Sequence, residues 1–365
     1  MNKKMLIVGM AITIGFGLSG CDEEVTSTSM RNTLVQTAAF KKSETDIIYK
    51  YMKAFPKNVQ ISIGKIGNGQ IYYYGAHNQS DSVVTVDNKS SGFEIGSISK
   101  VFTSTLLAQL VLEDKVSLDE DIAGRLPFAL HDGISISYEQ LANHTSGLAR
   151  DIDDLTLNDV GYHEEKDLDY SDIARYLEKD LALKYDQNTY HYSNVAVGAL
   201  GYMLTRIENK PYEQLIQERI LAPLSMSNTS TIRGDRLVPA LAISHDEPIP
   251  LAFKSAGGII STVEDMYQFA LASFDPKEAY ALTQTPTFRI DESTQIGLAW
   301  SLMHNEDTGL DFIFHGGATM GYRSFIVLDT EHKNGLIILS NLPIESNEHA
   351  IVDLAMELAR ENLGD

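Results

Sequence analysis

The sequence predicts an α+β protein in which an antiparallel sheet, built from both ends of the chain, is flanked by helices and holds an inserted, mostly helical part. Near the amino end, apolar residues alternate at 59–63, a Gly-Asn-Gly turn follows, and a second run returns at 71–74. This is a β-hairpin pattern. Residues 118–282 are mostly helical runs and loops, and strand-like runs resume near Ile296. Strands at both ends with helices between them indicate one body rather than two tandem domains.

The carboxyl-terminal part is predicted to contain four strands and a closing helix. The strand-like runs are residues 297–303, 310–314, 322–328 and 336–340. Asn334-Gly335 predicts the hairpin turn between the last two, and a helix is expected from about Ser346. A capping-box pattern places the start of the domain at Ser43. The domain is expected to span 43–365, with an α/β part at about 43–97 and 290–365 and a helical part at about 98–289.

The first twenty of the 365 residues have the pattern of a signal peptide. Lys3 and Lys4 form a basic start, residues 5–17 are apolar but too short to span a bilayer, and small residues precede Cys21. This segment resembles the lipobox of bacterial lipoproteins, in which the cysteine becomes the lipid-modified first residue. The resemblance implies lipidation at Cys21. An ordinary secretory signal with a chance cysteine is the alternative.

Residues 21–42 are predicted to form a flexible tether, because they are rich in Ser, Thr and charge and show little periodicity. An exported protein, anchored by lipid to the bacterial cell membrane on its periplasmic or outer face, is therefore expected. Asp22 resembles the signal that retains some lipoproteins at the inner membrane. Cys21 is the only cysteine, so an intramolecular disulfide is impossible.

Charge and composition exclude several classes of function. The formal net charge is −21 at pH 7, which argues against nucleic acid or anionic lipid as a binding partner. The sequence has no Gly-x-Ser-x-Gly, which disfavours a Ser-His-Asp hydrolase, and no His-Glu-x-x-His or comparable cluster, which disfavours a metallohydrolase. We expect a monomer that needs no metal and no cofactor.

Ser97 and Lys100 form a Ser-x-x-Lys step at the start of an apolar run that can form a helix. Residues three apart lie on one face of a helix, so the lysine amine would lie beside the serine hydroxyl. A serine becomes an effective nucleophile when a neighbouring group takes its proton. Burial can lower the pKa of a lysine far enough for that role. Taken alone, a capped helix start with a surface lysine gives the same pattern.

Four further stretches carry related chemistry. They are residues 141–148, Tyr190-His191-Tyr192-Ser193-Asn194, Lys254-Ser255-Ala256-Gly257-Gly258 and His315-Gly316-Gly317-Ala318. A Ser-x-x-Lys, a Tyr-x-Asn and a His-Gly-Gly in this order resemble the serine β-lactamase and penicillin-binding-protein superfamily. The branch it resembles most contains the class C β-lactamases with related D-alanyl-D-alanine carboxypeptidases and esterases. The resemblance runs from about Ile61 to Asn341 and implies a β-lactamase/transpeptidase-like fold.

The resemblance also implies catalytic and substrate-binding roles. Ser97 would be acylated, Lys100 would hold or accept its proton, and Tyr192 would relay that proton. Asn194 would donate to a substrate carbonyl and orient Lys100. The other expected substrate-binding residues share one strand edge: His315, Gly316, Gly317 and Ala318. The Ser97 and Ala318 amides would form the oxyanion hole, and the glycines would let substrate approach the strand.

One departure from the family pattern concerns His315. Class C β-lactamases carry lysine at this place, whereas some carboxypeptidases and esterases carry histidine. A histidine is largely neutral at pH 7 and would grip a substrate carboxylate weakly. Arg323, close behind, could supply the missing charge. His144 is expected to be structural, its ring capping a turn.

The predicted function is a serine hydrolase that works through an acyl-enzyme. Its substrate would be a small molecule or a peptidoglycan peptide, first of all a D-alanyl peptide or a β-lactam. Two alternatives stay open: a carboxylesterase acting on small esters, and a non-catalytic sensor that binds penicillin or wall fragments.

Overall fold

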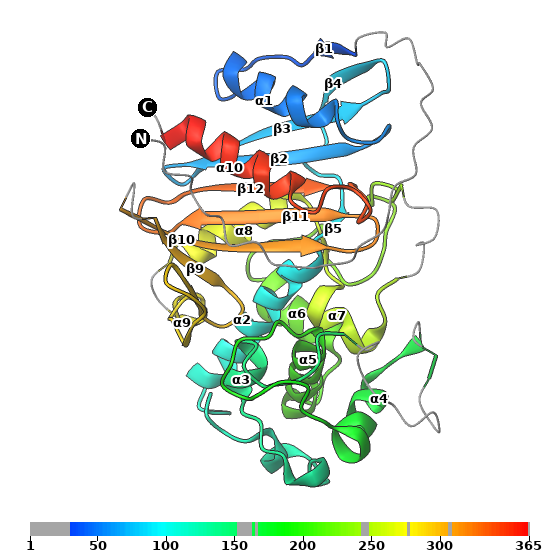
Figure 1. Ribbon diagram of the computed structural model, residues 1–365, viewed down its shortest axis with the longest axis vertical. Coiled ribbons are helices and arrows are strands. Elements are labelled where there is room, and N and C mark those ends of the chain that lie inside the picture. The colour runs from blue at the N-terminus through cyan, green and yellow to red at the C-terminus, as the bar shows by residue number, and fades with distance from the viewer. Residues whose placement is uncertain are drawn as a thin grey trace.

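Figure 1 shows the computed structural model, which describes residues 30–151, 163–164, 167–241, 248–275, 278–305 and 309–363. The expected signal peptide, Cys21 and the first part of the expected tether lie outside these residues. Across the described ranges, none of the helices is both long enough and apolar enough to cross a membrane.

Within the described residues, the largest element is a ten-stranded sheet with the order β1-β4-β3-β2-β12-β11-β10-β9-β8-β7 (Figure 1). In that order the strands span Arg31–Thr33, Ser82–Val86, Gln70–Asn78, Gln60–Gly67, Asn334–Ser340, Arg323–Asp329, Leu310–Ala318, Ser301–Asn305, Thr294–Ile296 and Phe288–Arg289. A small second sheet pairs β5 (Phe93–Glu94) with β6 (Ile260–Ser261).

The two ends of the chain meet in the middle of the large sheet. Strand β2 pairs antiparallel with β12, and Ile63 lies opposite Ile338. Successive residues of β12 face different cores: Ile338 packs on one side of the sheet, and Ile337 and Leu339 pack on the other. Because both faces are covered, β12 is apolar over most of its length. The predicted α+β fold is confirmed.

The folded part begins earlier than the predicted boundary at Ser43. Strand β1 pairs in parallel with β4, so the sheet is mixed rather than wholly antiparallel. Phe40 is buried, and its ring packs on that of Tyr74 with centroids 4.9 Å apart. The expectation of a tether is therefore wrong for residues 31–42. A three-residue edge strand is too short to give a periodic hydrophobic pattern, and a single buried aromatic residue gives none. The sequence therefore did not indicate order in this segment.

The last hairpin turns earlier than predicted. Asn334 and Gly335 already belong to the β11–β12 ladder, opposite Asp329 and Leu328. The chain reverses before them, and Lys333 adopts the left-handed conformation with a φ of 55°. The Asn334 side-chain oxygen accepts instead from the backbone N–H of Asn68 in the β2–β3 turn.

Helices cover both faces of the sheet. Helices α1 (Lys42–Met52) and α10 (Ala350–Leu363) lie side by side over one face (Figure 1), and α10 is the predicted closing helix. Helix α8 (Val263–Ser273) packs on β2 and β12 from the other face. The predicted helical part, residues 98–289, therefore includes α8, which packs on the sheet. The chain returns to the sheet at α8, before it forms β7.

The helical part surrounds α2 (Ser99–Leu112), which contacts α5, α6, α7 and α9. The other helices of this part are α3 (Tyr138–Ala142), α4 (Tyr170–Arg175), α5 (Asn194–Glu208), α6 (Tyr212–Ile216), α7 (Lys254–Gly257) and α9 (Glu278–Thr283). The first ten residues of α2 are all buried, as expected for a helix without a polar face. This burial also encloses Lys100.

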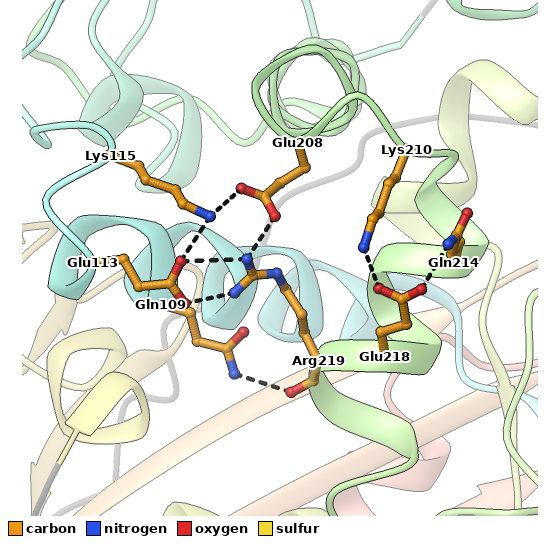
Figure 2. Close-up of polar contacts among 8 residues, drawn as sticks. All are labelled: Gln109, Glu113, Lys115, Glu208, Lys210, Gln214, Glu218 and Arg219. Atoms are coloured by element: carbon orange, nitrogen blue, oxygen red, sulfur yellow. Dashed lines mark hydrogen bonds and ion pairs between the residues drawn. The ribbon is translucent and has the colours of Figure 1, made fainter.

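An ion-pair network fixes the far ends of α2 and α5, the two helices that begin beside the predicted site (Figure 2). Arg219 contacts Glu113 at 2.7 Å and Glu208 at 2.5 Å. Lys115 contacts the same two carboxylates at 2.9 and 2.6 Å. Arg219 belongs to a π-helical segment, Gln217–Leu221, that continues α6. The network thus sets the spacing of three helices at the end opposite the site.

Candidate active site

Ser97 lies in the turn that joins the small sheet to the central helix. The chain leaves β5, passes through a 3₁₀ turn at Gly96–Ile98 and enters α2. Gly96 has a φ of +51°, and a Cβ atom there would lie 2.6 Å from the backbone nitrogen of Ala318. Glycine at this position therefore allows the left-handed turn and lets β10 approach the Ser97 turn closely.

Lys100 lies directly behind Ser97 and is fully buried. Its Nζ donates to Ser97 Oγ at 3.1 Å and to the backbone carbonyl of Ala256 at 2.6 Å. Burial lowers the pKa of Lys100 to about 7, against the opposing effect of the Asp151 carboxylate. Near neutral pH a large fraction of Lys100 is therefore unprotonated and able to accept the Ser97 proton.

The Tyr192 ring lies next to two cationic groups. Lys100 Nζ is 4.9 Å from the ring centroid, and the guanidinium carbon of Arg150 is 5.2 Å from it. Burial raises the pKa of Tyr192 above its usual value, although a hydrogen bond with Ser97 acts in the opposite direction. The phenol thus stays protonated at neutral pH, which suits a proton relay better than a phenolate base.

His144 fixes the chain on both sides of Tyr192. Its Nδ1 accepts from the backbone N–H of Ser193 at 3.2 Å, and its carbonyl accepts from the N–H of His191 at 2.9 Å. The His144 and Tyr192 rings pack with centroids 4.4 Å apart. Burial lowers the pKa of His144 well below its usual value, which agrees with a neutral ring whose Nδ1 accepts. His144 therefore supports the Tyr192 segment instead of simply capping a turn.

His315 lies on β10 and is 7% exposed. Burial, and then the nearby positive charge of Lys100, lower the pKa of His315 to about 4. In the neutral ring, Nδ1 donates to the carbonyl of Gly316 at 2.7 Å, so Nε2 carries the lone pair and can only accept. His315 therefore brings no positive charge to a substrate carboxylate at neutral pH.

The β10 edge next to Ser97 presents a backbone N–H to the site. The N–H of Thr319 donates to the carbonyl of Tyr322 at 2.9 Å. Because N–H groups alternate in direction along a strand, the N–H of Ala318 points to the opposite edge. Pairing of β10 with β9 on that edge ends at Phe314, and Gly96 lies against Ala318. This arrangement is what an oxyanion hole shared with the Ser97 turn requires.

The two glycines of β10, Gly316 and Gly317, differ in how much space a side chain would have. A Cβ atom on Gly317 would lie 2.0 Å from the Ile95 carbonyl oxygen and 2.3 Å from Ser324 Oγ. A Cβ atom on Gly316 would meet nothing closer than a Phe325 ring carbon at 3.7 Å. Gly317 is thus required by the packing of β10 on the Ser97 turn, a reason separate from the expected approach of substrate to the strand.

Asn194 is the first residue of α5, and its side chain contacts Asp151. The Asn194 amide donates to the Asp151 carboxylate, and its backbone N–H donates to the Arg150 carbonyl at 2.7 Å. Asp151 also forms an ion pair with Arg150 at 3.2 Å. In this structure Lys100 hydrogen-bonds to Ser97 and Ala256, and the expected contact with Asn194 is not among these bonds.

A cavity of about 640 Å³ connects these residues. The predicted residues that line it are Ser97, Tyr192, Asn194, His315, Gly316, Gly317 and Ala318. Apolar side chains form much of the remaining wall: Leu168, Ile249, Pro250, Phe253, Met320 and Ile344. A mostly apolar cavity with a few convergent polar groups suits a small organic substrate.

Arg150 and Asp151 were missed by the sequence analysis. They follow the 141–148 stretch after one intervening residue, but a single adjacent pair of opposite charges has no spacing that marks a site. Arg323 was considered as the extra cation near Tyr192. Its guanidinium instead donates to backbone carbonyls of the loop before α10, including Ile344 at 2.7 Å. The guanidinium next to Tyr192 belongs to Arg150.

Among the described residues, one cluster has donors suited to a cation: His163, Asp169 and Asp172. Asp172 accepts from the backbone N–H of Asp169 at 2.8 Å and contacts His163 Nδ1 at 2.9 Å. The bond between Asp172 and Asp169 is part of the capping box that starts α4, and His163 adds a contact to it. The cluster is separate from the lining of the cavity at Ser97, and we assign it a structural role.

The site brings together the groups that acyl transfer to a serine would use: the Ser97 hydroxyl, the buried Lys100 amine, the Tyr192 phenol and the backbone N–H of Ala318. The chain belongs to the Beta-lactamase family, whose model matches residues 50–360.

Comparison with named proteins places the chain among distant relatives. It is 24% identical over 308 residues to Protein flp of Staphylococcus aureus (strain N315), covering 78% of this chain and 60% of that protein. It is 26% identical over 276 residues to a Beta-lactamase of Pseudomonas fluorescens, covering 71% and 73% of the two chains. The chain thus spans only 60% of the length of the Staphylococcus aureus relative.

Solved structures show the same fold. A Beta-lactamase/D-alanine carboxypeptidase from Yersinia pestis, complexed with citrate, superposes with a TM-score of 0.71 at 20% identity over 87% of this chain and 99% of that one. An octameric penicillin-binding protein homologue from Pyrococcus abyssi gives 0.70 at 20% identity over 88% and 77%.

Proposed function

We propose that the protein is a serine hydrolase that cleaves the amide or ester bond of a small substrate through an acyl-enzyme on Ser97. The observation that carries this proposal is the Lys100 amine, fully buried, 3.1 Å from Ser97 Oγ and with a pKa of about 7. The names of the relatives, β-lactamase and D-alanine carboxypeptidase, support D-alanyl peptides or β-lactams as the first substrate class.

In the proposed acylation step, Lys100 takes the Ser97 proton while Oγ bonds to the substrate carbonyl carbon. The N–H groups of Ser97 and Ala318 stabilise the negative charge that develops on the carbonyl oxygen. When the tetrahedral intermediate collapses, the bond to the leaving group breaks and that group receives the proton from Lys100 through Tyr192. A water molecule then gives a proton to Lys100 along the same route and attacks the ester; the bond to Ser97 Oγ breaks, Oγ receives that proton from Lys100, and the acid is released.

A carboxylesterase is the second candidate, and a specific observation favours it. D-alanyl peptides and penicillins carry a carboxylate near the scissile bond, and His315 is neutral at physiological pH because burial depresses its pKa. Small esters need no cation at this position. The same Ser97 and Lys100 chemistry would serve both kinds of substrate.

The test is intact-mass spectrometry of the mature protein after incubation with a penicillin, a D-Ala-D-Ala peptide and a phenyl ester. We expect an acyl adduct on Ser97 with at least one compound, and no adduct in Ser97→Ala. An adduct mapped to Ser146 or Ser193 would overturn the assignment. An adduct that forms but never turns over would favour the sensor alternative.

A further inference from the structure

We infer that Asp151 determines the charge class of the substrate: its carboxylate occupies the polar subsite beside Asn194 and so disfavours substrates that carry a carboxylate near the scissile bond. This inference rests on the proposed function. It goes beyond that function by naming a specificity-determining residue, and it favours neutral esters over the carboxylate-bearing D-alanyl peptides and β-lactams that the names of the relatives suggest.

The first argument is geometric. In the free protein, Asp151 is bound by the two groups of this wall that are best suited to a carboxylate. The Asn194 side-chain amide donates to Asp151, and the Arg150 guanidinium forms an ion pair with it at 3.2 Å. All three residues line the cavity that contains Ser97. A substrate carboxylate would therefore have to displace Asp151 or lie beside it.

The second argument concerns charge. Asp151 balances Arg150, so the guanidinium beside Tyr192 brings no net positive charge to this wall. His315 is neutral near pH 7, and the Arg323 guanidinium donates to backbone carbonyls. Lys100 lies behind Ser97 and uses hydrogen bonds to Ser97 and Ala256. The two guanidiniums that line the cavity are thus engaged by Asp151 and by backbone carbonyls, and Asp151 adds a negative charge to this wall.

The side chains involved can change partners. Arg150 and Asp151 are 41% and 44% exposed, so water and a substrate can reach both. Replacement of Asp151 by Asn keeps an oxygen that can accept from Asn194 but removes the negative charge. Replacement by Ala also frees the Asn194 amide. The two variants thus separate the charge from the hydrogen bond.

The experiment compares two phenylacetate esters, one of phenol and one of meta-hydroxybenzoate, which differ by a carboxylate on the leaving group. The measured quantity is the ratio of kcat/KM for the anionic ester to that for the neutral ester. We expect Asp151→Asn to raise this ratio about tenfold, as removal of a like charge at a half-exposed site would do. Asp151→Ala should raise it at least as much.

Glu348 provides a matched control, because it lines the same cavity and its side chain is also 44% exposed. Glu348→Gln changes the net charge by the same amount but does not touch the Asn194 subsite, so the ratio should stay within about twofold of wild type. An unchanged ratio in both Asp151 variants, or an equal rise in Glu348→Gln, would overturn the inference. If neither ester acylates Ser97 in wild type, the ester candidate and this inference both fail. The proposed acyl-enzyme itself fails only if the penicillin and the D-Ala-D-Ala peptide also give no adduct.

Discussion

Burial favours the neutral forms of three ionisable side chains around Ser97. It lowers the pKa of Lys100 to about 7, lowers that of His315 to about 4 and raises that of Tyr192. At neutral pH only Lys100 is close to its pKa, so it can both accept and return a proton during turnover. This makes Lys100 the base and Tyr192 the relay in our account.

His315→Lys should change both the pH dependence and the substrate preference. A second ammonium near Lys100 disfavours its protonated form and lowers its pKa further. The acidic limb of the kcat/KM profile, where activity rises with pH, should therefore move to lower pH, and use of a penicillin should improve relative to a neutral ester. Superimposable profiles for both proteins on both substrates would show that His315 lies away from the reacting atoms.

At this scale, spacing explains which residues could be found from the sequence. Ser97 and Lys100 are three residues apart at a helix start, and Tyr192 and His315 belong to short recognisable strings. Their roles still rest on the proposal above. Asp151 could not be found in this way, because its contact with Asn194 joins residues 43 positions apart in the chain and neither stretch alone indicates that they meet.

At the scale of elements, the contact between β10 and the Ser97 turn depends on missing side chains on both partners, Gly96 in the turn and Gly317 in the strand. Gly317→Ala would place Cβ 2.0 Å from the Ile95 carbonyl oxygen, and neither backbone can move without disturbing the site. We expect the free energy of unfolding to fall by about 1–3 kcal/mol, the usual cost of overpacking. Urea denaturation measures it.

Gly316→Ala is the control for that change, since its Cβ atom would meet a ring carbon of Phe325 only at an ordinary 3.7 Å. It should leave the urea midpoint close to that of wild type. Equal loss of stability in the two variants would show that replacing any glycine of this strand is destabilising. The close approach of Gly317 to Ile95 would then not explain the effect.

Long elements were predictable and short ones were not. Strands β2 and β12 contain enough apolar residues at strand spacing to be predicted from the sequence. The same holds for their longer neighbours β3, β10 and β11. The short strands β1, β7 and β8 have two or three residues each. They exist because a neighbouring strand offers free backbone groups, which is a tertiary effect that local propensity does not contain.

At the scale of the whole molecule, the Arg219 network holds α2 and α5 at the ends remote from Ser97 (Figure 2). Arg219 is 20% exposed and Glu208 is 10% exposed. Arg219→Met should lower the free energy of unfolding by about 1–2 kcal/mol, between the values for exposed and buried pairs. Lys210→Met, which removes only the more exposed pair with Glu218, should cost less. A reversed order in thermal melting would contradict this account of the network.

Membrane attachment is a separate proposal for the whole chain, and it depends on Cys21. We expect Cys21→Ala to abolish labelling by a fatty-acid analogue and to move the protein from the membrane fraction to the soluble fraction, because the acyl chains attached through Cys21 would supply the membrane binding. Cell fractionation with metabolic labelling checks it. Unchanged membrane partition would refute the lipid anchor without affecting the active-site proposal.

The central claim is that Lys100, partly unprotonated near neutral pH, activates Ser97, and the pH dependence of Ser97 acylation tests it most directly. The measurement is the single-turnover rate of acylation by a neutral phenyl ester between pH 5 and pH 9, followed by rapid quenching and mass spectrometry. We predict a rate that rises with pH through about 7, the pKa of Lys100, and acylation that is lost in Lys100→Arg, whose guanidinium stays protonated. A rate that is independent of pH over this range, or an acylation rate unchanged in Lys100→Arg, would contradict the account.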